Sequence, residues 1–154
     1  MINKKIKSYG VYLIGPMEEV SIKEMTGWRE TASTALGYQD IPVYDPTRRL
    51  SLRYQLEDYL DNEKMTVNLY KRIFKQDLQD IHNSSVVLAD CRRNKGAIRR
   101  TGSDMEMMFA HVHNKIIIAW CDEKDTLHPF YESIITEKHF SLDSAIEAAA
   151  EYFT

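Results

Sequence analysis

The stretch Val86-Val-Leu-Ala-Asp90, followed after a basic loop by Thr101-Gly-Ser-Asp-Met-Glu106, decides the fold. Four apolar residues closed by an aspartate, and then a helix start that contains glycine, are typical of a buried parallel strand that feeds a helix. In open α/β sheets, ligands bind in the crevice beyond the carboxyl ends of such strands. We therefore expect Asp90 and the turn after Gly102 to face a pocket, with Glu106 in that first helical turn.

Strand-like and helix-like segments alternate along the rest of the chain. Apolar β-rich runs predict strands, and apolar residues at 3.6-residue spacing predict amphipathic helices. Pro42 favours an edge position for the second strand. The predicted strands are 9–15, 41–45, 86–90, 116–120 and a short one within 133–140; the predicted helices are 23–36, 51–61, 66–82, 103–113 and 141–152, and a loop is predicted at 128–129. This alternation predicts an α/β protein with a doubly wound, parallel, five-stranded sheet and helices on both faces.

Length and composition narrow the class of protein. The 154 residues fit a single domain spanning 1–154, and the net charge of -3 gives no overall field toward nucleic acid or membrane. We therefore expect no stable nucleic-acid binding. No apolar run approaches the roughly 20 residues of a membrane span, and the N-terminus is too polar for a signal peptide, so we expect a cytoplasmic protein. Cys91 and Cys121 lack metal-ligand or CxxC spacing and are interpreted as reduced thiols without a role.

Glu106 has two interpretations that the residues alone leave open. Ser103-Asp-Met-Glu106 matches a capping box, in which the serine hydroxyl and the glutamate carboxylate satisfy exposed N–H groups at the helix start. A carboxylate at that place would also be held ionised by the helix dipole, which suits a nucleophile. The spacing favours neither interpretation over the other.

Asp77 places a carboxylate in an otherwise apolar row, between Ile73 and Ile81. It is either a buried aspartate held by an arginine or a helix end, or a general acid or substrate hydrogen-bond partner whose pKa the apolar row raises. Asp90, at a strand end, is either a loop or cap residue or a ligand contact. The basic run 92–100 is either a solvated loop or a phosphate contact.

At these residues the sequence resembles the nucleoside 2-deoxyribosyltransferases and the related nucleoside 5'-monophosphate N-glycosidases. The matching segments follow the family's order over nearly the whole chain. They are Tyr12-Leu-Ile-Gly-Pro-Met17, Gly27-Trp-Arg-Glu30, Tyr44-Asp-Pro-Thr-Arg-Arg49, Asp77-Leu-Gln-Asp-Ile81, Ser84-Ser-Val-Val-Leu-Ala-Asp90, Thr101 to Ala110, His128-Pro129 and Ser141-Leu-Asp-Ser-Ala-Ile-Glu147. The resemblance implies a flavodoxin-like sheet, a nucleoside or nucleotide and a free base as small-molecule partners, and a homo-oligomer. The implied chemistry needs no metal and no cofactor.

The resemblance also implies roles for single residues. Glu106 would attack C1' and hold a covalent deoxyribosyl intermediate, Tyr12 would orient Glu106, and Asp77 would protonate the departing base. Retaining glycosyl transfer needs one ionised and one protonated carboxyl group, which agrees with this assignment. The region 128–130 corresponds to the part of the family that reaches a neighbouring subunit's site. The predicted substrate-binding residues are Gly15, Pro16, Met17, Asp45, Arg48, Asp90, Arg100, Gly102, Ser103, His128 and Phe130.

Arg100 is a departure from the family. Some transferases carry an aspartate six residues before the nucleophile, where this chain has Arg100. Together with Arg99, it favours a phosphorylated substrate. The first prediction is a deoxyribosyltransferase. The alternatives are a deoxynucleoside 5'-monophosphate N-glycosidase, in which water takes the sugar from Glu106, and a non-catalytic nucleotide-binding module, in which Glu106 only caps its helix.

Overall fold

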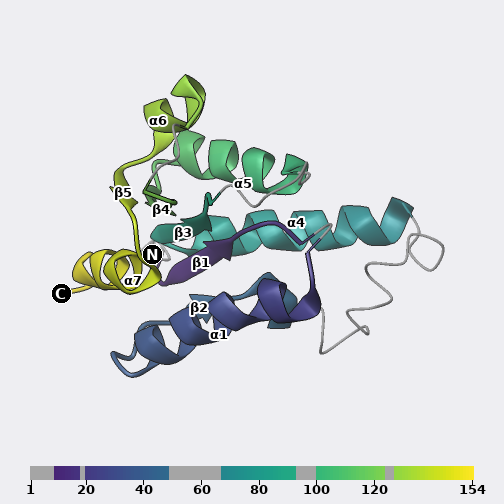
Figure 1. Cartoon of the computed structure of the whole chain (residues 1–154). Coiled ribbons are helices and arrows are strands. Elements are labelled where there is room, and N and C mark those ends of the chain that lie inside the picture. Colours follow the sequence, from purple (N-terminus) through teal and green to yellow (C-terminus); the bar gives the residue numbers. More distant parts are fainter. Residues whose placement is uncertain (1–8, 18–19, 49–66, 93–99, 124–126) are drawn as a thin grey trace, which may run out of the picture.

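The computed structural model describes residues 9–17, 20–48, 67–92, 100–123 and 127–154 (Figure 1). Their strands form one all-parallel, five-stranded sheet with the order β2-β1-β3-β4-β5, which is the flavodoxin-like order. The strands are β1 (Val11–Ile14), β2 (Val43–Tyr44), β3 (Val86–Asp90), β4 (Ile116–Trp120) and β5 (Glu137–His139). The predicted fold class is therefore confirmed, and β2 lies at the edge of the sheet as Pro42 indicated.

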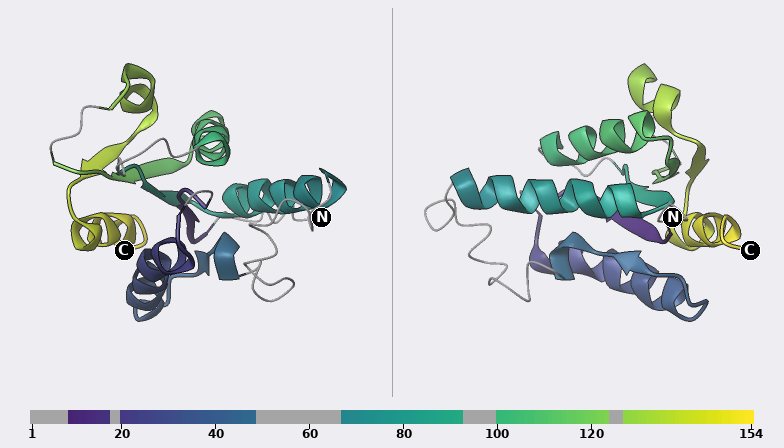
Figure 2. Two further views of the ribbon diagram at one scale, coloured as in Figure 1. Left: turned by 45° about the vertical axis from the view of Figure 1, so that its right-hand side comes forward. Right: turned by 180° about the vertical axis from the view of Figure 1, so that it is seen from behind.

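Helices cover both faces of the sheet, α1 and α7 on one and α4 and α5 on the other (Figure 2). The described helices are α1 (Ile22–Gly37), α4 (Val67–Asn83), α5 (Thr101–Val112), α6 (Pro129–Ile134) and α7 (Leu142–Glu151). The bounds of α1, α4 and α7 lie within one residue of the predicted ones. The predicted helix 51–61 lies outside the described residues. Short α6 was not predicted, because His128-Pro129 indicates only a loop.

The alternation of side chains along β1 separates two hydrophobic cores. Val11 and Leu13 pack toward α1 and α7, whereas Tyr12 and Ile14 pack toward α4 and α5. All four are fully buried, as expected of a central parallel strand. The Tyr12 side chain therefore lies on the face of the sheet that α5 covers.

The start of α5 differs from the prediction. The helix begins at Thr101, two residues before the predicted start, and no side chain caps it within the described residues. Ser103 lies inside the first turn, and Glu106 is in the next turn, with its carboxylate bonded to Tyr12. Of the two interpretations that the sequence left open for Glu106, the capping box is therefore wrong, because Ser103 is not the N-cap residue and the Glu106 carboxylate bonds to Tyr12. By contrast, the Ser21 hydroxyl caps α1 by accepting a bond from the Glu24 N–H, 3.1 Å away.

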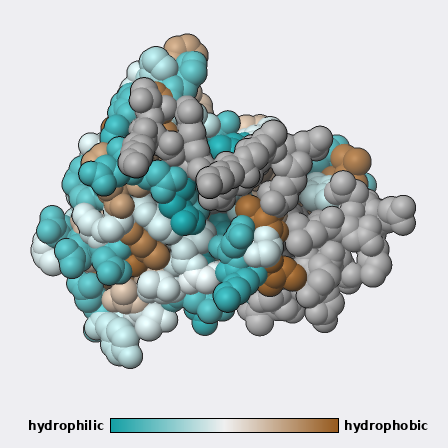
Figure 3. All heavy atoms as spheres, in the orientation of Figure 1, coloured by the Kyte–Doolittle hydropathy of each residue, from teal (hydrophilic) through white to brown (hydrophobic). Residues whose placement is uncertain are grey.

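Three further observations concern the surface, the helices and the two cysteines. On the face in Figure 3, hydrophobic residues form small separate groups among hydrophilic ones. No helix in the described ranges has the length and apolar character that crossing a bilayer requires. Cys91 and Cys121 are free thiols buried on the α5 side of the sheet.

Candidate active site

The centre of the site is a hydrogen bond between β1 and α5. The Tyr12 hydroxyl donates to Glu106 Oε1 over 2.8 Å. Tyr12 is 0% exposed and Glu106 9% exposed, so water competes little with this bond. The hydroxyl therefore fixes the direction in which the Glu106 carboxylate points.

Glu106 faces a cavity of about 200 Å³ at the carboxyl ends of β1 and β3. Three segments form its wall: the loop after β1, the N-terminal part of α4, and the first two turns of α5. The lining residues are Gly15, Pro16, Met17, Tyr70, Ile73, Phe74, Asp77, Thr101, Gly102, Ser103 and Glu106. The predicted crevice thus exists, and it brings Glu106 and half-buried Asp77 to one cavity. Tyr70, Ile73 and Phe74 give the cavity an apolar side, to which the sequence analysis had assigned no substrate contact.

The electrostatics of Glu106 differ from the expected helix-dipole effect. Burial raises the pKa of Glu106 to about 8, and the Asp77 carboxylate raises it as well. The hydrogen bond from Tyr12 and the positive charge of Arg29 lower this pKa, but only in part. Burial also raises the pKa of Tyr12 well above its usual value, with the charge of Glu106 as the next cause. Tyr12 therefore keeps its proton and remains the donor.

Arg29 is a buried residue of α1 to which the sequence assigned no role, although it belongs to the segment Gly27-Trp-Arg-Glu30. It is 0% exposed. Its Nη2 donates to the Gly15 carbonyl over 2.9 Å, and its Nη1 donates to the Met25 carbonyl over 2.7 Å. A signal for it was present, because Arg29 follows Met25 at i+4 spacing on the apolar stripe of α1.

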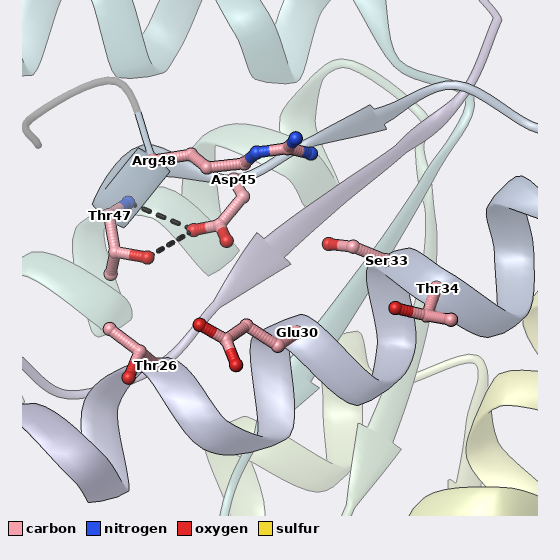
Figure 4. Close-up of a pocket in the computed structure, with 7 residues that line it drawn as sticks. All are labelled: Thr26, Glu30, Ser33, Thr34, Asp45, Thr47 and Arg48. Carbon is pink, nitrogen blue, oxygen red and sulfur yellow. Dashed lines mark hydrogen bonds between the residues drawn. The ribbon is translucent and has the colours of Figure 1, made fainter. Parts of the chain in front are cut away.

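Asp45 and Arg48 line a different cavity, of about 430 Å³, between α1 and the segment after β2. In Figure 4 the side chains of α1 and those of Asp45, Thr47 and Arg48 face each other across it. Asp45 Oδ1 accepts bonds from the Thr47 N–H (2.9 Å) and hydroxyl (2.7 Å), and lies 3.9 Å from Arg29 Nε. The structure does not bring Asp45 and Arg48 to the Glu106 cavity.

Asp90 and Arg100 also lie outside the lining of that cavity. The Arg92 guanidinium holds the Asp90 carboxylate through two bonds of 3.0 Å and lies 3.6 Å from the centre of the Trp120 ring. Arg100 Nη2 donates to the Asp90 carbonyl over 2.6 Å. Asp90 instead lines a third cavity, of about 330 Å³, with Trp28 and Trp120. Both arginines therefore hold the end of β3; the rest of the basic run, 93–99, lies outside the described residues.

His128 and Phe130 lie at the start of α6. His128 Nδ1 accepts a bond from the Phe130 N–H over 3.1 Å, and the Phe130 side chain is 78% exposed. The Tyr131 hydroxyl bonds to Asp104 and so ties α6 to α5. Neither His128 nor Phe130 lines the Glu106 cavity of its own chain. Their contribution to a neighbouring subunit stays a prediction.

Comparison with known proteins supports the fold. No protein-family model and no curated protein matches the sequence. The structure is similar to a 2-deoxyribosyltransferase from Bacillus psychrosaccharolyticus, with a TM-score of 0.68, 15% identity, and coverage of 89% of this chain and 90% of that one. It is also similar to a 2-deoxyribosyltransferase from Leishmania mexicana, with a TM-score of 0.66, 13% identity, and coverage of 95% and 99%.

A third solved structure extends the likeness to a hydrolytic enzyme. A CMP N-glycosidase from Clostridium botulinum matches with a TM-score of 0.55 and 13% identity, over 92% of this chain and 98% of that one. At these identities the likeness is one of fold. The chain thus has the fold shared by 2-deoxyribosyltransferases and a CMP N-glycosidase, which confirms at the level of fold the resemblance stated from its sequence.

Proposed function

We propose that the protein is a nucleoside 2-deoxyribosyltransferase that moves 2-deoxyribose from one base to another through a covalent intermediate on Glu106. The observation that carries the proposal is the 2.8 Å bond from Tyr12 to Glu106, at a cavity that also presents Asp77. One carboxyl group is fixed in direction, and a second one lies on the opposing helix. The fold likeness to two transferases supports the same chemistry.

The two carboxyl groups divide the reaction between them. Ionised Glu106 attacks C1' of the sugar and forms an ester as the C1'–N bond breaks, and Asp77 gives its proton to the departing base. In the second half an acceptor base attacks C1' and gives its N–H proton to the Asp77 carboxylate, the ester bond breaks, and Glu106 regains its negative charge. Tyr12 keeps one carboxylate oxygen occupied, so the other oxygen is the one that reacts.

The walls of the cavity suit the two parts of a nucleoside. Tyr70 and Phe74 on α4 line the side next to Asp77. Aromatic rings there can pack against a planar base. Gly15 and Gly102 also line the cavity, and a Cβ atom on Gly102 would meet nothing within 4 Å, so a sugar can approach the backbone at the start of α5 closely. We infer that the base lies toward α4 and the sugar toward Glu106.

A specific observation favours the nucleotide N-glycosidase as a second candidate. The first residues of α5, Thr101 to Ser103, line the cavity, and within the described residues no side chain caps this helix. Amide groups at a helix start favour an anion such as a 5'-phosphate. Against this, the described arginines of the basic run, Arg92 and Arg100, are engaged at the end of β3. The third alternative, in which Glu106 only caps its helix, is not supported, because its carboxylate bonds to Tyr12.

One assay tests the proposal. The protein is incubated with 2'-deoxynucleosides or their 5'-monophosphates, with and without an acceptor base, and the products are separated by chromatography. A transferase makes a new nucleoside in proportion to acceptor, whereas the N-glycosidase releases base from monophosphates without acceptor. Glu106→Gln, which keeps the shape of the side chain, is the matched control. Absence of both products from the unmodified protein overturns the proposal.

A further inference from the structure

Arg29 is a buried cation at the back of the candidate active site. A charge that is 0% exposed persists only when polar groups satisfy it. Here Nη1 and Nη2 donate to the carbonyl groups of Met25 and Gly15, and the guanidinium lies 4.7 Å from the Trp28 ring. The carbonyl of Met25 is in the helix of Arg29 itself, whereas that of Gly15 is the first group after β1. Arg29 therefore links α1 to the loop after β1.

That loop is a wall of the Glu106 cavity. Gly15, Pro16 and Met17 all line it. A Cβ atom on Gly15 would lie 2.8 Å from Trp28 and 3.2 Å from Arg29 Nη2, so the loop is packed directly on these two side chains. The position of the wall consequently depends on where the guanidinium is held.

Asp45 places a negative charge on the other side of the guanidinium, beyond hydrogen-bond distance of Nε. Its Oδ1 lies 3.9 Å from Arg29 Nε and is itself fixed by two bonds from Thr47. The sequence resemblance had placed Asp45 at the substrate, but the structure places it behind Arg29. Among the negative charges that raise the pKa of Arg29, Asp45 has the largest effect, ahead of Glu106 and Asp90.

We propose that Arg29 is a positioning residue of the candidate active site: it holds the 15–17 wall through the Gly15 carbonyl and supplies a buried positive charge behind Glu106. The inference rests on the proposed function and deepens it. Arg29 touches neither substrate nor reacting atoms, since it acts from the α1 side of the sheet through the end of β1.

The charges around Glu106 agree with this role. Tyr12 faces Glu106 from β1, Asp77 influences it from α4, and Arg29 influences it from α1. Burial and the Asp77 charge raise the pKa of Glu106, and the Arg29 charge lowers it. Loss of the arginine charge would therefore make Glu106 harder to ionise. Replacing Asp45 with a neutral residue would leave the positive charge of Arg29 less compensated. The pKa of Glu106 would then fall.

The test separates the charge from the geometry with three variants. Arg29→Met removes both, and Arg29→Lys keeps the charge but cannot bind two carbonyl groups with one planar fork. Asp45→Asn removes the compensating charge. Lys75→Met, which removes an exposed cation from α4, is the control. The readouts are KM, the pH profile of kcat/KM, and the titration midpoint of Glu106 from NMR of protein labelled at the glutamate carboxyl carbons, assigned with Glu106→Gln.

We expect Arg29→Met to move the Glu106 midpoint up by about 0.5–1 pH unit and to raise KM about tenfold. Arg29→Lys should restore the midpoint but not KM, and Asp45→Asn should move the midpoint down. Unchanged midpoint and KM in Arg29→Met overturn the inference. If Arg29→Met fails to fold, an unmoved or raised midpoint in Asp45→Asn overturns it instead.

The NMR midpoint also separates this inference from the proposed function. It requires no turnover, so it reports on Arg29 even if the protein releases no base. An upward shift in Arg29→Met without any activity would support the positioning role and refute the transferase. Transferase activity in the wild-type protein, together with a Glu106 midpoint that Arg29→Met does not move, would support the proposed function and overturn the positioning role.

Discussion

The Tyr12 hydroxyl and Glu106 Oε1 lie 2.8 Å apart although 94 positions separate the two residues in the chain. The bond joins strand β1 to helix α5, which packs on the sheet. Since both groups are buried, the bond controls the orientation of the carboxylate and also how easily it loses its proton. The first prediction follows from this second effect.

Tyr12→Phe should move the activity profile to higher pH. The substitution keeps the ring and removes the hydrogen bond that lowers the pKa of Glu106. If the pKa rises by one unit above about 8, roughly tenfold fewer molecules carry ionised Glu106 at neutral pH. The measurement is kcat/KM against pH for wild type and variant. An unmoved ascending limb would show that the hydroxyl does not affect the reacting group.

Glu106→Gln should be inactive yet more stable at alkaline pH. The Glu106 carboxyl ionises near its ordinary pKa of 4.5 when unfolded and near about 8 when folded. Between these values the folded state keeps a proton that the unfolded state has released, so stability falls as pH rises through this window. Glutamine does not titrate.

Thermal denaturation at several pH values checks this difference. The advantage of Glu106→Gln over wild type should be small near pH 4.5 and grow until about pH 8, reaching about 2 kcal/mol or more. A difference between the two proteins that stays constant with pH would contradict the raised pKa. Glu147→Gln, an exposed position on α7, is a suitable control.

Asp77→Asn should slow the departure of ordinary bases more than that of activated ones. The amide fills the same space in the cavity wall but delivers no proton, and such proton transfer contributes about 10²–10⁴-fold. The measurement compares kcat for natural deoxynucleosides with kcat for a nucleoside whose base leaves as a stabilised anion. Equal losses for both substrates would remove Asp77 from the role of acid.

Arg100→Ala should act on stability and leave substrate choice unchanged. Its Nη2 binds the Asp90 carbonyl at 2.6 Å, and a hydrogen bond of a charged group contributes about 1.5–3 kcal/mol. We expect lower stability, with KM changing by the same factor for a deoxynucleoside and for its monophosphate. A KM increase confined to the monophosphate would place the guanidinium at a phosphate. That result would support the N-glycosidase over the transferase.

The central strands were predictable because their physics is local. Long apolar runs such as 86–89 and 116–119 bury both faces of a parallel sheet, and no tertiary contact competes with that pattern. The start of α5 was not predictable in the same way. Ser103 and Glu106 satisfy a local capping pattern, but the buried Tyr12 hydroxyl is a better partner for the carboxylate than an N–H at the helix end.

The alternation of side chains along the strands predicts which cavity each strand-end residue lines. Along β3, Val86 and Leu88 face α1, and Asp90 continues that alternation toward Trp28. Tyr12 has the opposite parity on β1 and faces α5. Strand parity, which the amino-acid sequence alone contains, therefore separates Asp90 from Glu106. The cavities themselves depend on how α4 and α5 pack, which spacing alone does not encode.

Gly15 constrains the order in which substitutions at this site can accumulate. Any side chain there meets Trp28 at 2.8 Å and Asp90 Cβ at 3.3 Å, from the face of the sheet opposite the cavity. In a directed-evolution lineage, a change of Gly15 made first forces Trp28 or the Gly15 backbone to move, whereas the same change made after Trp28 is shortened meets only Arg29 Nη2 at 3.2 Å and Asp90 Cβ at 3.3 Å. Changes to the Gly15 wall of the Glu106 cavity therefore have to begin at Trp28, on the opposite face of the sheet.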